Sequence, residues 1–179
     1  MEVAAMEPKV VYQTERLVVR DWTESDGDRV FDIYRRWEVS RWLGADPRVM
    51  TDRDAASRTI ERWNTRNADA VYGIWAVEEK ATGVVAGTVL LVPLPSDGPS
   101  STGEVEVGWH FHPDSWGRGL ATESAQGAIA HGFKAGLGEI YAVVRPDNGP
   151  SIAVCKRLGM QPLGLTSRWY DAELESFVI

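Results

Sequence analysis

Residues 114–125 read DSWGRGLATESA and connect a strand-like segment, EVEVGWHFHP (104–113), to a helix-like one. Within the connection Gly117 and Gly119 stand one residue apart, and the small Ala121 follows. Small residues at a helix start leave backbone N–H groups unhindered, and these groups together with the helix dipole attract an anion. The segment therefore predicts an anion-binding turn between a strand and a helix.

Before this turn, hydrophobic periodicity predicts one strand, two helices and three strands. Residues 16–20 are typical of a strand. Helices are expected from Thr23, which opens a capping-box-like TESD, and from near Thr51. Alternating segments joined by short loops then predict antiparallel strands over residues 72–79, 83–92 and 104–111.

After the turn the same reasoning predicts a helix that ends in AGLG (135–138), a strand in EIYAVV (139–144) and a short helix capped by Ser151 that ends at Gly159. The tail RWYDAELESFVI (168–179) resembles a final hairpin. The fold class is thus a mixed α/β domain of order β-α-α-β-β-β-α-β-α-β-β, and we expect one domain over residues 1–179.

The composition limits the partners. A formal net charge of −7 argues against nucleic-acid binding, and a cationic substrate suits this sign. A single cysteine excludes an internal disulfide framework and a cysteine-based metal site. Without an apolar run of about 18 residues or a signal pattern at the start, we expect a soluble cytoplasmic protein that does not enter a membrane.

Two familiar glycine-rich turns fit poorly. A Walker phosphate loop needs a longer spacing and a Gly-Lys pair, which this segment lacks. A dinucleotide fingerprint needs a third glycine where Thr122 stands, and three apparent antiparallel strands precede the turn, so a nicotinamide-dependent enzyme is improbable.

A wider segment, HPDSWGRGLATESAQGAIAHGF (112–133), resembles the acyl-coenzyme A loop of the GCN5-related N-acetyltransferases (GNAT), with Trp116, Gly119 and Ala121 at the three pattern positions. The resemblance is strongest to the RimJ/RimL-like branch, which acetylates ribosomal protein N-termini. TERLVVRDW (14–22) and NGPSIAVCKRLGM (148–160) extend the resemblance over almost the whole chain.

The resemblance implies a central, mostly antiparallel sheet that splays between the fourth and fifth strands, residues 104–111 and 139–144. It implies acetyl-CoA as co-substrate, with its pyrophosphate at the glycine turn and its pantetheine arm along the fourth strand. The implied cofactor-binding residues are Trp109, His110, Phe111, Trp116, Gly117, Arg118, Gly119, Leu120, Ala121, Thr122, Asn148 and Ser151.

The implied reaction is direct attack of a primary amine on the thioester in a ternary complex. Glu106 matches the glutamate of the family's strand pattern and is the leading candidate for the base, while Glu104 projects to the same face and is an alternative. Glu123 has a sufficient structural reason in the first turn of a helix, so we do not count it as catalytic.

The general acid is open. Many relatives use a tyrosine four residues before the glycine that ends the short helix, and Cys155 stands there in this sequence. Ser151, Cys155 itself or solvent are the candidates, although a lone cysteine on a helix is more often a small buried residue. This departure also motivates an alternative: a coenzyme-A-binding regulatory or interaction module without catalysis.

Relatives form the acceptor pocket from the first two helices and the final hairpin. Trp42, Trp169 and Tyr170 are the expected substrate-binding residues, whereas core packing is the interpretation for Trp37 and Trp63. A protein N-terminus and a small-molecule amine are both compatible as acceptors. His110, His112 and His131 form no obvious ligand set, so we expect no metal, and a homodimer is a frequent state of small enzymes.

Overall fold

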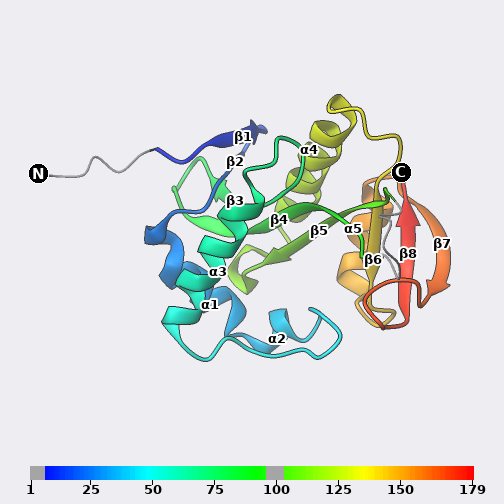
Figure 1. Ribbon diagram of the computed structural model, residues 1–179, viewed down its shortest axis with the longest axis horizontal. Coiled ribbons are helices and arrows are strands. Elements are labelled where there is room, and N and C mark those ends of the chain that lie inside the picture. Colours follow the sequence, from blue (N-terminus) through cyan, green and yellow to red (C-terminus); the bar gives the residue numbers. More distant parts are fainter. Residues whose placement is uncertain (1–6, 96–102) are drawn as a thin grey trace, which may run out of the picture.

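An eight-stranded mixed sheet organises the computed structural model, which describes residues 7–95 and 103–179 (Figure 1). The strand order is β1-β2-β3-β4-β5-β6-β8-β7. The strands are β1 (Val10–Gln13), β2 (Leu17–Arg20), β3 (Gly73–Glu79), β4 (Val85–Pro93), β5 (Val105–Phe111), β6 (Tyr141–Val144), β7 (Gln161–Thr166) and β8 (Leu174–Val178).

The helices cover both faces of this sheet. They are α1 (Gly27–Tyr34), α2 (Trp37–Ser40), α3 (Arg53–Arg66), α4 (Leu120–Lys134) and α5 (Gly149–Arg157), with short 3₁₀ helices η1 (Glu24–Asp26) and η2 (Pro113–Ser115). Among the described residues, none of these helices is long and apolar enough to cross a membrane.

Strand alternation divides the core into two layers. Val77 of β3 packs in a cluster with Leu120 and Ile129 of α4. Its neighbour Ala76 faces the opposite side and packs with residues of α1 and α3, including Ile60. Successive strand side chains point to opposite faces, so a single strand anchors both helical layers.

The predicted element order is confirmed, with two additions. The strand β1 pairs antiparallel with β2 through an irregular register, and its side chains are only partly buried, so its alternation is weak. The helix α2 has only four residues, too few for a periodic pattern. The final hairpin is formed by β7 and β8 and begins at Gln161, before the segment in which it was expected.

Two local predictions are wrong. Ser151 is not the cap of α5; Asn148 is, and its Oδ1 accepts a hydrogen bond of 3.3 Å from the backbone N–H of Ser151. Trp37 does not pack in the core, since 54% of its surface is exposed. The helix α2 turns away from the line of α1, which carries Trp37 off the stripe that buries Val30 and Ile33.

The sheet opens between β5 and β6. These strands are parallel and pair only at Glu106 and Tyr141, whereas β5 pairs with β4 along its whole length. Because both strands run away from this one pair, they diverge toward their carboxyl ends, where α4 and α5 begin (Figure 1). The predicted splay is therefore present, with two helix N-termini at its open end.

Candidate active site

The glycine turn has the backbone geometry that its sequence predicts. Gly117 and Gly119 have φ of +72° and +77°, a left-handed conformation that residues with a Cβ rarely adopt. Gly119 is the N-cap of α4, and the N–H of Glu123 makes a helical bond of 3.0 Å to its carbonyl oxygen. The preceding N–H groups of Leu120, Ala121 and Thr122 have no intrahelical acceptor, as at any helix start.

A cavity of about 760 Å³ lies against this turn. It extends from the first turns of α4 and α5 to the diverging part of β5 and the loop after α2. All the residues expected to bind the cofactor line it except Arg118: Trp109, His110, Phe111, Trp116, Gly117, Gly119, Leu120, Ala121, Thr122, Asn148 and Ser151.

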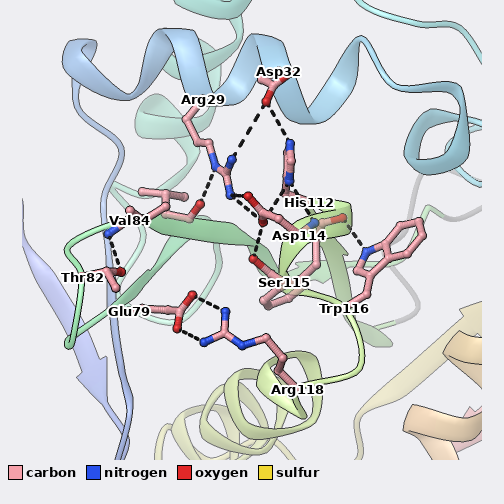
Figure 2. Close-up of polar contacts among 12 residues, drawn as sticks. Arg29, Asp32, Glu79, Thr82, Val84, His112, Asp114, Ser115, Trp116 and Arg118 are labelled. Carbon is pink, nitrogen blue, oxygen red and sulfur yellow. Dashed lines mark hydrogen bonds and ion pairs between the residues drawn. The ribbon is translucent and has the colours of Figure 1, made fainter.

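Arg118 points away from the cavity, contrary to the sequence prediction. Its guanidinium forms two hydrogen bonds, of 2.8 and 2.5 Å, with the carboxylate of Glu79 on β3 (Figure 2). The ion pair neutralises the charge that was expected to meet a phosphate. Arg118 instead ties the glycine turn to the sheet.

A second set of polar contacts fixes the start of the turn to α1 (Figure 2). His112 Nδ1 accepts the backbone N–H of Asp114 at 3.1 Å, so its Nε2–H donates to Asp32 Oδ2 of α1 at 2.9 Å. Arg29 bridges the carbonyl of Val85 and the carboxylate of Asp114, at 2.7 and 2.9 Å. The turn is thereby held to α1 and β4.

Asp114 is ionised in this network. Burial raises its pKa, but hydrogen bonds from Arg29 and Ser115 and the charge of Arg29 outweigh it and lower the pKa to about 2. Directly before the two glycines, the indole N–H of Trp116 donates to the carbonyl of Phe111 at 2.8 Å. That carbonyl, at the end of β5, already has a partner.

A second cavity, of about 300 Å³, adjoins the first and contains Glu106. We call it the acceptor cavity. Burial raises the pKa of Glu106 to about 7, against the opposing effect of a hydrogen bond from Tyr170. The phenol of Tyr170 donates to Glu106 Oε2 at 2.5 Å. A carboxylate with a pKa near 7 is suited to accept a proton at neutral pH.

The structure separates the two glutamates that the sequence left as alternatives. Arg168 donates two hydrogen bonds to Glu104, of 2.8 and 3.1 Å, and Glu104 lines neither cavity. Glu106 lines the acceptor cavity at the one point where β5 and β6 pair. Of the two, Glu106 is the one that lines a cavity.

Three successive residues of the loop between β7 and β8 contact residues at the start of β5 and of β6. Arg168 pairs with Glu104, Trp169 packs its ring 5.8 Å from that of Tyr141, and Tyr170 bonds Glu106. Trp169 is only 3% exposed and lines neither cavity. It supports the loop, whereas the sequence analysis expected it to line the acceptor pocket.

Two of the three expected acceptor residues line the acceptor cavity. Tyr170 does so at a backbone φ of +60°, a strained conformation for a residue with a Cβ. Trp42 lines both cavities, with the guanidinium of Arg41 4.3 Å from its ring centre. Trp63 is buried between α3 and α1, as predicted.

Cys155 does not reach either cavity. Its side chain is fully buried on the core side of α5, and burial raises the pKa of its thiol to about 12. Cys155 is therefore a small buried core residue, which is the more frequent role of a lone cysteine on a helix. Ser151, on the first turn of the same helix, lines both cavities.

Sequence reasoning missed the side-chain environment of His110, which the resemblance placed among the cofactor-binding residues. The hydroxyl of Tyr34 lies 3.1 Å from His110 Nδ1 and 2.8 Å from the hydroxyl of Thr88. Burial lowers the pKa of His110 to about 4, so a neutral imidazole faces both cavities. Glu123 accepts hydrogen bonds from Thr14 and Arg16, a structural role that agrees with its exclusion from catalysis.

Comparison with known proteins identifies the family. Residues 16–161 match the model of the acetyltransferase (GNAT) domain. The uncharacterized N-acetyltransferase YnaD of Bacillus subtilis is 36% identical over 166 residues, which cover 88% of this chain and 91% of YnaD.

Solved structures share the fold at low identity. The ribosomal-protein-S5-alanine acetyltransferase of Vibrio fischeri superposes with a TM-score of 0.73 at 18% identity, covering 94% of each chain. Mycobacterium smegmatis RimJ, solved in complex with a CoA-disulfide, gives 0.73 at 18% identity over 91% of this chain and 81% of RimJ. With the family match over most of its length, this chain belongs to the GNAT family and is an acetyl-CoA-dependent N-acetyltransferase.

Proposed function

We propose that the enzyme transfers the acetyl group to a neutral primary amine by direct attack within a ternary complex, with Glu106 as the base. The observation that carries this proposal is the meeting of the two cavities at the splay of β5 and β6. One cavity contains the glycine turn and the other contains Glu106, and they share the lining residues Trp42, Leu43, Trp109, His110, Asn148 and Ser151.

The first cavity suits coenzyme A. Backbone N–H groups at the start of α4 would bind the pyrophosphate, since the two left-handed glycines allow close approach. Arg157 of α5 also lines this cavity and would add positive charge there. The unpaired edge of β5 would bind the amides of the pantetheine arm. Acetyl-CoA supplies the thioester carbonyl when bound.

The acceptor cavity suits an amine that must lose a proton. An α-amine, with a pKa of about 7.7 to 8.0, needs less help from a base than a lysine side chain. The amine nitrogen attacks the thioester carbon, the carbon–sulfur bond breaks, and the proton of the nitrogen passes to Glu106 directly or through a water molecule. Protein N-terminal α-amines and small-molecule amines are the acceptors in this class.

Ser151 is the proposed donor to the departing sulfur: its hydroxyl would pass a proton to the thiolate while it takes one from solvent, so that no alkoxide is left. It lines both cavities, whereas the thiol of Cys155 is fully buried and lines neither. The cysteine in place of the family's tyrosine therefore does not by itself argue for an inactive binding module. Solvent in the open cavity is the other route for this proton, because a free thiol has a pKa of only about 8.5.

The test is release of coenzyme A from acetyl-CoA with α-amino peptides, free amino acids, polyamines and aminoglycosides as acceptors. Glu106→Gln should lower kcat by roughly 10²-fold or more and leave acetyl-CoA affinity unchanged. Glu104→Gln is the matched control, two residues away on the same strand segment and expected to keep most activity. Equal activity of the two variants would remove Glu106 as the base.

A further inference from the structure

The acceptor cavity combines apolar walls with an unusual set of charges. Its walls include Ile74, Leu90, Val92 and Leu174, which suit the carbon skeleton of a ligand. The charged side chains among its lining residues are Glu106, Arg66 and Arg145. Two arginines thus face one carboxylate in a cavity of about 300 Å³.

Neither arginine is neutralised by a carboxylate within the described ranges. Arg66 stands exposed at the last position of α3, near enough to Tyr170 to interact with its phenol electrostatically. Arg145 follows β6 and donates a hydrogen bond of 2.5 Å to the carbonyl of Gly44, a neutral partner. Glu104, two residues before Glu106, is paired with Arg168.

The local charge therefore opposes the charge of the whole chain. A net charge of −7 favours a cationic substrate in general, but interactions at contact distance outweigh those that solvent screens. A polyamine or aminoglycoside would carry several positive charges into a cavity that two arginines already line. Juxtaposed like charges repel each other and select against such ligands.

We propose that the acceptor is a small amine that also carries a carboxylate, an α-amino acid or a compound of that type with an apolar side chain. Its amine faces Glu106, its carboxylate pairs with Arg66 and Arg145, and its side chain packs on the apolar wall beside Trp42. Arginine favours this role because its planar fork matches a carboxylate with two parallel hydrogen bonds. The inference rests on the proposed function and names its substrate class.

The experiment compares four acceptors at saturating acetyl-CoA: phenylalanine, phenylalanine amide, phenethylamine and spermidine. Values of kcat/KM are expressed per neutral amine, because these amines differ in pKa. We expect phenylalanine to exceed the amide and phenethylamine by roughly tenfold or more, the effect of a charge-assisted hydrogen bond, and spermidine to be the poorest acceptor.

Three variants assign that preference to residues. Arg66→Gln and Arg145→Gln should each raise the KM for phenylalanine and bring the acid-to-amide ratio toward one, with little change for the amide. Arg62→Gln, at an exposed position of the helix that carries Arg66 but outside both cavities, is the control that should behave as the unchanged enzyme. A Phe-Asp peptide amide places the carboxylate on an acidic side chain, and a higher kcat/KM with it would overturn the assignment to a small acceptor.

Failure of the inference and failure of the proposed function have different signatures. Equal use of the acid, amide and phenethylamine, with both arginine variants like Arg62→Gln, would overturn the inference while the function stands. Spermidine as the best acceptor would do the same. If calorimetry shows no acetyl-CoA binding and no acceptor is acetylated, the proposed function fails and this inference falls with it.

Discussion

Tyr170 donates a 2.5 Å hydrogen bond to the carboxylate of Glu106, from a loop 64 residues away in the chain. The same loop holds Arg168 on Glu104 and Trp169 on Tyr141, so the hydroxyl is positioned by contacts on both sides of the splay. The hydrogen bond favours the ionised carboxylate, whereas burial favours the neutral one. The pKa of the proposed base is the balance of the two.

Tyr170→Phe should shift the acidic limb of the kcat/KM profile to higher pH by about one unit. Losing the hydrogen bond raises the pKa of Glu106 above about 7, and less of the base is then ionised at any given pH. Tyr141→Phe is the control, because its hydroxyl bonds Glu139 and not Glu106. An unshifted profile in Tyr170→Phe would show that this hydrogen bond does not tune the base.

Glu106→Gln should become more stable than the unchanged enzyme as the pH rises. The pKa of Glu106 is about 7 in the folded state and 4.5 as a model value, so the folded protein binds the extra proton between these values. The stabilisation that this carboxyl group contributes is fully present below pH 4.5 and is lost as the pH rises through about 7. Urea unfolding at pH 4 and pH 8 should show the variant gaining about 3 kcal/mol relative to the parent over that interval.

Gly119→Ala should weaken acetyl-CoA binding and destabilise the fold by about 1–2 kcal/mol, the cost of a left-handed residue with a Cβ. Its φ of +77° and its position as N-cap of α4 place the strain on the anion-binding turn. Gly138→Ala serves as the comparison, since a Cβ there has open space and an ordinary backbone conformation. Calorimetry and thermal melting measure both effects, and equal behaviour of the two variants would contradict the role of the turn.

Asp32→Ala should raise the Kd for acetyl-CoA by about tenfold, the loss expected from removing one charge-assisted partner. Asp32 holds the ring of His112, and that ring caps the backbone of Asp114 at the start of the turn. Asp28→Ala tests the alternative that any acid on α1 matters, since Asp28 pairs with the exposed Arg53. An unchanged Kd in Asp32→Ala would mean that the turn keeps its shape without this support.

The sequence was most informative where a pattern is local. The glycine spacing predicted the turn at α4, and alternation predicted the strands β3, β4 and β5 with their order. Short elements with no period escaped detection: β1 and α2 have four residues each. Trp37 was misassigned because the apolar spacing of α1 continues in the sequence past Tyr34, where the helix ends. The spacing alone therefore could not locate that end.

The candidate site was predictable only in part, because it depends on contacts between distant segments. Half of the residues that line the first cavity lie between Trp109 and Thr122, so they could be listed from one continuous motif. Arg118 was different: its partner Glu79 lies on another strand, and no spacing relates the two. No spacing in the sequence relates Tyr170 to Glu106 either. Likewise, the sequence does not show that Cys155 lies on the buried side of α5, away from the cavity.

The divergence of β5 and β6 has a consequence for how the acceptor specificity of this enzyme can evolve. In the proposed function, coenzyme A is bound mainly by main-chain amides, and most substitutions around the turn, other than those of its left-handed glycines Gly117 and Gly119, keep an amide N–H at each position. The acceptor cavity, by contrast, is defined by side chains, among them Trp42, Arg66, Arg145 and Tyr170. Under the proposed function, single substitutions in the acceptor cavity would change which amine is used while the acetyl donor stays the same.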